Sequence, residues 1–296
     1  MEITFLGTSC MVPTKERNHQ SIFLFYKGDG ILIDCGEGTQ RQMKIADIKF
    51  SKINKILLTH WHGDHVLGLP GLLQSINAYG YESKLYIYGP KETKERFNYL
   101  LKAFTFKLNF EYEIIELKNK DVIETKELII ETRELEHGIP CLGYSIKEKD
   151  VRKIKIPFVK KHGIPEGPLL GELQNNKKII WKGKEILPED ATYVLKGKKV
   201  AIILDTEFCN NALELANESD LLISESVYPD ELYNKAEEYK HMTAKNAAYL
   251  ASKSNSKKLI LTHFSQRFKT IENILEEAKQ IFPETYASYD LMKIKV

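Results

Sequence analysis

The sequence predicts a layered α/β protein that is interrupted by a basic insertion. Strand-like apolar runs alternate with helical patterns in both halves of the chain, and several strand-like runs follow one another as in hairpins. A stretch rich in Pro, Gly and Lys between the two halves breaks this rhythm. The chain has 296 residues, 43% of them hydrophobic, which is enough for one large domain with a sizeable core.

The first half contains apolar runs rich in Ile, Leu and Phe, which we expect to be strands. They are Glu2–Leu6, Ser21–Tyr26, Gly30–Asp34, Lys55–Thr59, Leu85–Tyr88, Glu111–Leu117 and Leu128–Arg133. Between them lie segments with apolar residues at helical spacing, the last of which follows a Gly-Pro break. These expected helices are Thr39–Ala46, Leu67–Tyr79 and Lys91–Lys102.

The second half repeats the alternation. Its expected strands are Val200–Leu204, Leu221–Ser224 and Lys258–Thr262. Its expected helices are Asn210–Asn217, Thr243–Ser252 and Thr270–Phe282. Strands that alternate with helices in this way are typical of layered α/β domains.

The insertion runs from about residue 148 to about residue 198. Between residues 147 and 199 there are 14 Lys and Arg against 7 Asp and Glu, although the net charge of the whole chain is only +2. Pro and Gly among the lysines predict an extended arm with little core of its own. By charge alone, this arm is either a solvated surface insertion or a binding surface for nucleic acid.

The four cysteines are scattered without a C-x-x-C pair, which argues against a disulfide framework or a Cys-ligated zinc. We expect Cys141 and Cys209 to be small buried residues. The first residues lack a basic segment followed by a long apolar one, and no stretch approaches the roughly 18 apolar residues of a membrane helix. We therefore expect a cytoplasmic protein with no membrane partner.

A metal site is predicted directly after the strand Lys55–Thr59. The segment His60-Trp-His-Gly-Asp-His65 contains three His and one Asp, although only 8 of the 296 residues are His. Imidazole nitrogens and carboxylate oxygens are the ligands that zinc and similar metals prefer. The H-x-H-x-D-H spacing lets alternate side chains point at two adjacent ions.

One loop cannot complete two metal sites, so further ligands should come from the ends of other strands. His137 follows Leu128–Arg133, Asp205 follows Val200–Leu204, and His263 follows Lys258–Thr262. Sites in layered α/β folds are built where strands meet loops. We therefore predict that these three residues complete the ligand set.

An H-x-H-x-D-H motif after a strand resembles the signature of the metallo-β-lactamase superfamily. The resemblance implies a four-layer αβ/βα sandwich with the inserted basic arm, and two zinc ions per subunit, which Mn²⁺ or another divalent metal could replace. The implied ligands are His60, His62 and His137 for one ion, Asp64, His65 and His263 for the other, and Asp205 for both. The superfamily carries many activities, so the function depends on the rest of the site.

Further segments resemble one branch, the ribonuclease Z family, whose members remove 3′ trailers from precursor tRNA. Pro13-Thr-Lys-Glu-Arg-Asn18 matches the family's P-x-K-x-R-N loop. The resemblance implies that Lys15, Arg17 and Asn18 contact the 3′ end of the RNA. Lys and Arg in such a loop suit contacts to phosphates and bases.

The segment Asp34-Cys-Gly-Glu-Gly-Thr-Gln-Arg-Gln42 is similar to the D-C-G-E-G-T-Q-x-Q of the same family. Asp34 resembles the buried acid that orients a ligand histidine without binding metal. Thr39 or Gln40 is expected to open a helix there, and Thr39 is expected to contact the substrate.

Two more matches lie in the second half and in the insertion. His241-Met-Thr243 resembles the family's H-x-T, and an imidazole that the metals do not need suits protonation of the leaving 3′ oxygen. Glu225 matches the Glu of the family's H-E-A-T segment, whose other positions differ here, and is expected to orient His241. Gly167-Pro168 resembles the G-P motif of the arm that clamps tRNA, which suits lysines that bind phosphates.

The resemblance covers almost the entire chain and implies an enzyme that cuts precursor tRNA after the discriminator nucleotide. Asp64 would orient the attacking water, and the products would be tRNA with a 3′ hydroxyl and a trailer with a 5′ phosphate. Family members form homodimers, so a homodimer is expected. The alternatives are a small-molecule phosphodiesterase or lactonase, or a non-catalytic RNA-binding subunit. The chain departs from the family at Leu204 and Glu207, which puts local substrate contacts in doubt.

Overall fold

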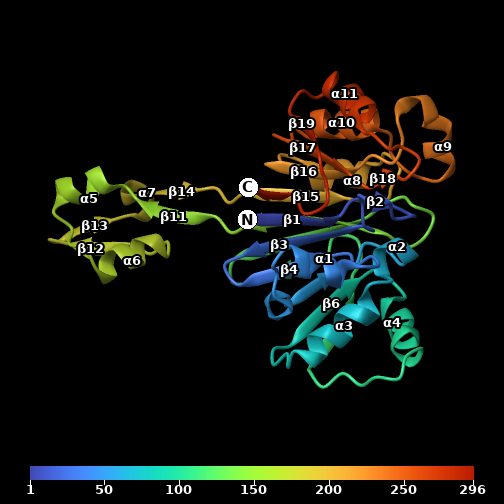
Figure 1. Ribbon diagram of the computed structural model, residues 1–296. Coiled ribbons are helices and arrows are strands. Elements are labelled where there is room, and N and C mark those ends of the chain that lie inside the picture. Colours follow the sequence, from blue (N-terminus) through green and yellow to red (C-terminus); the bar gives the residue numbers. More distant parts are fainter.

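The computed structural model describes residues 1–296 and shows four layers, in which two facing sheets lie between outer helices (Figure 1). Buried apolar side chains form one cluster between the sheets and one beneath the helices on each outer side. This order of helix, sheet, sheet and helix confirms the expected αβ/βα sandwich. The basic insertion projects away from the layers (Figure 1).

The first sheet has seven strands and combines the N-terminal half with the last strand of the chain. In spatial order they are β20 (Lys293–Lys295), β1 (Glu2–Gly7), β3 (Ser21–Tyr26), β4 (Asp29–Ile33), β5 (Lys55–Leu57), β6 (Leu85–Gly89) and β7 (Tyr112–Glu116). Side chains alternate between the two faces of a strand. In β4, Ile31 and Ile33 therefore face the second sheet, whereas Leu32 faces the outer helices.

The second sheet also has seven strands. In spatial order they are β19 (Thr285–Ala287), β17 (Leu259–Thr262), β16 (Leu221–Glu225), β15 (Lys199–Ile203), β10 (Leu142–Glu148), β9 (Leu128–Glu134) and β8 (Val122–Glu124). In β15, Val200 and Ile202 pack between the sheets, whereas Ala201 and Ile203 pack beneath helices. The strands from β15 to β19 are parallel, so their C-terminal ends meet at one edge.

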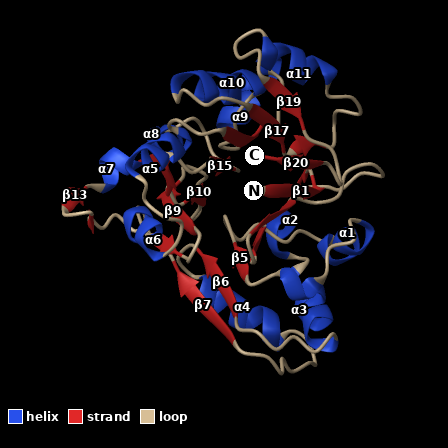
Figure 2. Cartoon of the chain, turned by 90° about the vertical axis from the view of Figure 1, so that its left-hand side faces the viewer, coloured by secondary structure: helices blue, strands red, loops and turns tan.

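Helices cover the outer face of each sheet, and the two helical layers lie on opposite sides in Figure 2. The first sheet is covered by α1 (Thr39–Ile45), α3 (Leu69–Ala78) and α4 (Thr93–Lys102), and the second by α8 (Asn210–Ala216), α10 (Ala244–Lys253) and α11 (Glu272–Lys279). Shorter helices are η1 (Phe50–Lys52), α2 (Gly63–Val66), η2 (Asp230–Leu232) and α9 (Tyr233–Glu238). Each helix is too short or too polar to span a membrane.

The expected strands and helices are present, but the prediction missed β10, which lies in the middle of the second sheet between β9 and β15. Its apolar residues Leu142, Tyr144 and Ile146 alternate with Gly143 and Ser145, a pattern that is typical of a strand. The short strands β8, β19 and β20 at the sheet edges were also missed. So was the two-residue pair of β2 (Ser9–Cys10) with β18 (Phe264–Ser265).

The arm leaves the second sheet after β10 and returns at β15. Its stalk is the antiparallel pair β11 (Val151–Ile154) and β14 (Thr192–Leu195). Its head consists of α5 (Ile156–His162), α6 (Pro168–Gln174), β12 (Ile179–Trp181), β13 (Lys184–Ile186) and α7 (Pro188–Ala191). The prediction of little core was wrong, because apolar residues between the lysines form a buried cluster: Val159, Ile164, Leu173, Ile179, Ile186 and Ala191.

Candidate metal centre

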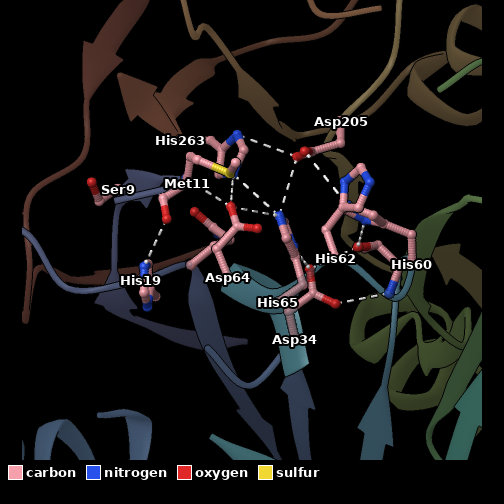
Figure 3. Close-up of polar contacts among 12 residues, drawn as sticks. Ser9, Met11, His19, Asp34, His60, His62, Asp64, His65, Asp205 and His263 are labelled. Atoms are coloured by element: carbon pink, nitrogen blue, oxygen red, sulfur yellow. Dashed lines mark hydrogen bonds and ion pairs between the residues drawn. The ribbon is translucent and has the colours of Figure 1, made fainter. Parts of the chain in front are cut away.

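The predicted metal ligands meet at one edge of the two sheets (Figure 3). Four of them lie in the segment that follows β5 and includes α2, and the others follow strands: His137 after β9, Asp205 after β15 and His263 after β17. Because buried strands of neighbouring layers end at the same edge, residues far apart in the chain come together here. Together they are His60, His62, Asp64, His65, His137, Asp205 and His263.

Asp205 lies between two groups of ligands (Figure 3), and each of its carboxylate oxygens contacts one group. Its Oδ2 lies 3.7 Å from Nε2 of His60 and 3.7 Å from Nε2 of His137. The His137 Nε2 atom in turn lies 3.2 Å from Nδ1 of His62. These four residues form the first group, in which the ligand atoms all lie within 4.8 Å of one another.

The second group surrounds the other oxygen of Asp205. Its Oδ1 lies 3.5 Å from Nε2 of His65 and 3.2 Å from Nδ1 of His263. Oδ2 of Asp64 lies 3.5 Å from Nε2 of His65 and 3.4 Å from Nε2 of His263. The two groups therefore have the composition implied by the resemblance, and Asp205 lies between them.

The chemistry of this cluster fits divalent cations. His60 Nε2, Asp205 Oδ1 and His263 Nδ1 are buried and have no hydrogen-bond partner, although an unpaired buried polar atom is costly. Burial lowers the pKa of His60 and of His62, whereas Asp205 outweighs burial and raises the pKa of His65 and of His263 well above the usual range. Imidazole nitrogens and carboxylate oxygens are the ligands that zinc prefers, so these residues would hold a divalent metal.

Two of the ligands have strained backbones. Asp205 has φ of 40° and His263 has φ of 60°, a left-handed conformation that is uncommon for residues other than Gly. Asp34, below the cluster, also has a positive φ of 55°. Such strain persists where the surroundings fix the residue, and it often accompanies a functional site.

Asp34 holds the ligand histidines from below. Its Oδ2 lies 2.7 Å from Nδ1 of His65, and both of its oxygens accept hydrogen bonds from Thr59. The hydroxyl of Thr59 also lies 3.0 Å from Nδ1 of His60. Fixing Nδ1 in this way leaves Nε2 of each histidine directed at the metal position. The role expected of Asp34 thus agrees with its contacts, whereas the sequence prediction did not include Thr59.

His241 lies beside the cluster on the segment before α10. Its Nδ1 lies 3.0 Å from Oε2 of the fully buried Glu225, and Oε1 of Glu225 accepts a hydrogen bond from the backbone N–H of Thr206. Burial lowers the tendency of His241 to become charged, but the Glu225 carboxylate outweighs it and raises the pKa of His241. The structure therefore brings together the pair that was expected from an incomplete motif match.

The residues of the predicted substrate loop differ in exposure and in their hydrogen bonds. Lys15 is exposed and free to contact RNA. The guanidinium of Arg17 donates hydrogen bonds to the carbonyls of Ser265 and Phe268. Asn18 donates from Nδ2 to the carbonyl of Glu37. Arg17 and Asn18 thus hold the loop in place.

Thr39 does not have the exposure that a substrate contact needs. It is fully buried, and its hydroxyl donates a hydrogen bond to the carbonyl of Gly36. The helix α1 does begin at Thr39, as expected. Direct contact of this side chain with RNA is therefore excluded, and Thr39 instead fixes the turn before α1.

Asp290, which the sequence prediction did not single out, anchors the same loop. It accepts hydrogen bonds from the Thr8 hydroxyl, the backbone N–H of Asn18 and Nε2 of Gln42, at 2.7 to 2.9 Å. Burial raises the pKa of Asp290 to about 6. No sequence pattern links Asp290 to partners more than 240 residues away, so only the fold could reveal it.

Gly167 and Pro168 lie in the head of the arm, where Pro168 begins α6. Both are exposed, and Gly167 has φ of 140°, which favours Gly. The structure does not bring them to the metal centre, because the arm leaves from the far end of β10 and β15 (Figure 1).

Comparisons with known proteins agree with this geometry. Residues 1–150 match the family model described as Anti-Pycsar protein Apyc1 and belong to that family. That match ends at the base of the arm and does not include Asp205 or His263. Ribonuclease Z of Methanothermobacter thermautotrophicus is 40% identical, and the alignment covers 100% of this chain and 97% of the relative.

Solved structures lead to the same assignment. Human tRNase Z, short form, superposes with a TM-score of 0.71 and 26% identity over 100% of this chain and 99% of the human one. The metallo-β-lactamase fold protein YhfI from Bacillus subtilis superposes with a TM-score of 0.72 at 18% identity, over 99% of this chain and 98% of its own, and this likeness concerns the fold alone. Because the first relative matches over the full length, the chain belongs to the ribonuclease Z family.

Proposed function

We propose that this chain is an endoribonuclease that removes the 3′ trailer of precursor tRNA after the discriminator nucleotide, with two zinc ions per subunit. The observation that carries the proposal is Asp205, whose two oxygens face two complete ligand groups. Family membership supports the RNA substrate. The products would be tRNA with a 3′ hydroxyl and a trailer with a 5′ phosphate.

Divalent ions in such a site lower the pKa of water and neutralise charge on a phosphoryl group. The protein supplies the orientation. Asp64 is held by the backbone N–H of Met11, which donates to its Oδ2 at 2.8 Å (Figure 3). The fixed carboxylate orients the attacking water in line with the scissile bond.

His241 supplies the proton for the departing 3′ oxygen. Its Nδ1 faces Glu225, so Nε2 is the nitrogen that remains to deliver a proton. Because Glu225 is itself fixed by Thr206, the ring is held in one orientation. A positioned acid of this kind contributes roughly 10²- to 10⁴-fold to a reaction rate.

The arm would bind the body of the tRNA. Its lysines suit sequence-independent contacts to the phosphates of a folded RNA. Gly167 and Pro168 at the start of α6 would belong to that surface, and Lys15 would contact the 3′ end near the metals. The chain is thus one domain with an inserted tRNA-binding arm at about residues 148–198.

We also propose a homodimer in which the arm of one subunit holds the RNA that the other cuts. Asp205 follows the C-terminal end of β15, whereas the arm joins its N-terminal end at Lys199. The arm therefore points away from its own metal centre (Figure 1). Mixing an arm-truncated chain with an Asp205→Asn chain should restore cleavage, and failure of a mixed dimer to do so would contradict this arrangement.

The proposed activity is tested by mapping 3′ ends after incubation with precursor tRNA that bears or lacks CCA, with and without a chelator. We expect cleavage after the discriminator nucleotide that the chelator abolishes. Cleavage that resists the chelator would rule out the metal-dependent reaction. Hydrolysis of small phosphodiesters without cleavage of precursor tRNA would favour a small-molecule phosphodiesterase instead.

A further inference from the structure

Cys10 lies against the second group of ligands. Its Sγ, a carboxylate oxygen of Asp64 and a ring nitrogen of His263 all lie within 4.8 Å of one another, and all three residues are buried. The scattered spacing of the cysteines argues against a cysteine metal site. The fold nevertheless brings this one thiol to two residues that would hold a metal.

The backbone fixes the thiol in that position from both sides. Strand β2 pairs in parallel with β18, so that Ser9 lies opposite Phe264, the residue after His263. The N–H of Phe264 donates to the carbonyl of Thr8 at 2.9 Å. On the other side of Cys10, the N–H of Met11 binds Asp64. Met11 is thus bonded to Asp64, and Ser9 pairs with the residue that follows His263.

The other cysteines differ in this respect. Cys35, Cys141 and Cys209 are also buried, but none belongs to a group of metal-ligating side chains. Cys10 also packs against the apolar Val227, so the experiment has to separate metal binding by the thiol from apolar packing. A second observation points toward a ligand, because the buried Nδ1 of His263 makes no hydrogen bond and has only an ion-pair contact of 3.2 Å to Oδ1 of Asp205.

We propose that Cys10 supplies a thiolate to the metal held by Asp64, His65, His263 and Asp205. When the metal binds, the S–H bond breaks, the proton passes to solvent and a sulfur–metal bond forms, with no change of oxidation state. Thiolates favour zinc over harder ions such as Mn²⁺. Cys10 therefore makes this position selective for soft divalent metals, an inference that rests on the metal centre of the proposed function.

Cobalt substitution tests the bond directly. The full-length Co²⁺-loaded protein should show the near-ultraviolet charge-transfer absorption of a thiolate bound to Co²⁺. Cys10→Ser should abolish this band, whereas Cys209→Ser, which removes a buried thiol elsewhere, should retain it. Absence of the band from the wild-type protein, or its persistence in Cys10→Ser, would overturn the proposal.

Metal competition provides a second readout that does not depend on activity. Cys10→Ser should lower the ratio of Zn²⁺ to Mn²⁺ affinity by at least about tenfold, since even outer partners of a metal contribute that much. An unchanged ratio would contradict the proposal. If Cys10→Ser does not fold, a chain in which Cys10 is the only cysteine should still show the band, and its absence there would also overturn the proposal.

The outcome is separable from that of the proposed function. Cleavage of precursor tRNA is measured by 3′-end mapping, which reports the reaction and not the identity of a ligand. Correct cleavage without a charge-transfer band would leave the endonuclease assignment intact and remove only the thiolate. A thiolate band without cleavage would support Cys10 as a ligand and remove the endonuclease assignment.

Discussion

The metal centre and the arm lie at opposite ends of the same strand, β15. At its C-terminal end Asp205 is 2% exposed and is surrounded by histidines. Its N-terminal end is reached from the arm, which carries exposed lysines and projects from the layers (Figure 1). The metal centre lies at the edge of sheets whose core clusters contain 20 or 21 buried residues each, whereas the arm has a separate cluster of six.

The difference agrees with the roles that we propose for the two regions. Hydrolysis needs a few groups that are fixed in place and shielded from water, since charges act most strongly there. Binding of a large polyanion such as RNA needs positive side chains that project from the layered domain toward the phosphates. Such side chains stay in water, so they carry little desolvation cost. Changes in the metal centre should therefore impair hydrolysis of every substrate, whereas changes in the arm should impair tRNA binding alone.

Asp205→Asn should have the largest effect. The carboxylate faces both ligand groups, so its loss should lower kcat/KM for precursor tRNA and for a small phosphodiester alike. We expect a loss greater than the roughly 10- to 100-fold caused by removing an outer partner of a metal. Steady-state kinetics together with metal analysis would check this, and retained activity at full metal content would contradict it.

His241→Ala should come next. It should lower kcat for precursor tRNA by roughly 10²- to 10⁴-fold, because the leaving oxygen loses its proton donor. Metal content should remain unchanged, which separates this variant from Asp205→Asn. Glu225→Gln should lower kcat in the same direction but by less. If either variant lost as much metal as Asp205→Asn, the pair of His241 and Glu225 would hold the metal ligands in place and would not donate a proton.

Leu173→Ala should affect the arm alone. It removes a fully buried side chain from the head, and such changes cost about 2 to 5 kcal/mol. Hydrogen exchange should show opening of the head, with weaker binding of tRNA and normal hydrolysis of a small phosphodiester. Ile202→Ala between the sheets is the matched control and should destabilise the whole protein. If Leu173→Ala impaired both reactions, the two regions would not be independent.

Asp290→Asn should have the smallest effect, on stability against pH. Burial raises the pKa of Asp290 from 3.8 to about 6, so the folded protein takes up this proton more readily than the unfolded chain. Stability from this group is therefore present at low pH and is lost as pH rises from about 4 to about 6. The variant lacks this loss, so its free energy of unfolding should rise relative to wild type across that range. Urea unfolding at about pH 4 and about pH 6 measures this. An equal difference between variant and wild type at both pH values would contradict the prediction.

Much of the metal centre was predictable because its chemistry is local. The ligands of the loop after β5 adjoin one another, and His137, Asp205 and His263 each follow an apolar strand. The layered fold was predictable for the same reason, from alternating apolar runs. Strand β10 was missed because Gly143 and Ser145 occupy its alternate positions, and Gly is depleted in strands.

Other features depend on contacts that no local pattern encodes. Arg17 has the charge that an RNA contact needs, but its guanidinium donates hydrogen bonds to the carbonyls of Ser265 and Phe268 within the protein. Asp290 reaches a loop near the other end of the chain. Cys10 meets His263 only because β2 pairs with β18. In each case the fold, and not the spacing, decides what the side chain contacts.

Truncation of the arm tests the separation of the two regions most directly. Arg152 and Val194 are paired in the stalk, so a two-residue Asn-Gly turn can replace residues 153–193 and close the hairpin. The measurement is kcat/KM for precursor tRNA and for bis(p-nitrophenyl) phosphate in the same preparation. We predict a loss of about tenfold or more on precursor tRNA, with weaker salt dependence, and unchanged hydrolysis of the small ester. Unchanged cleavage of precursor tRNA, or an equal loss on both substrates, would contradict the account.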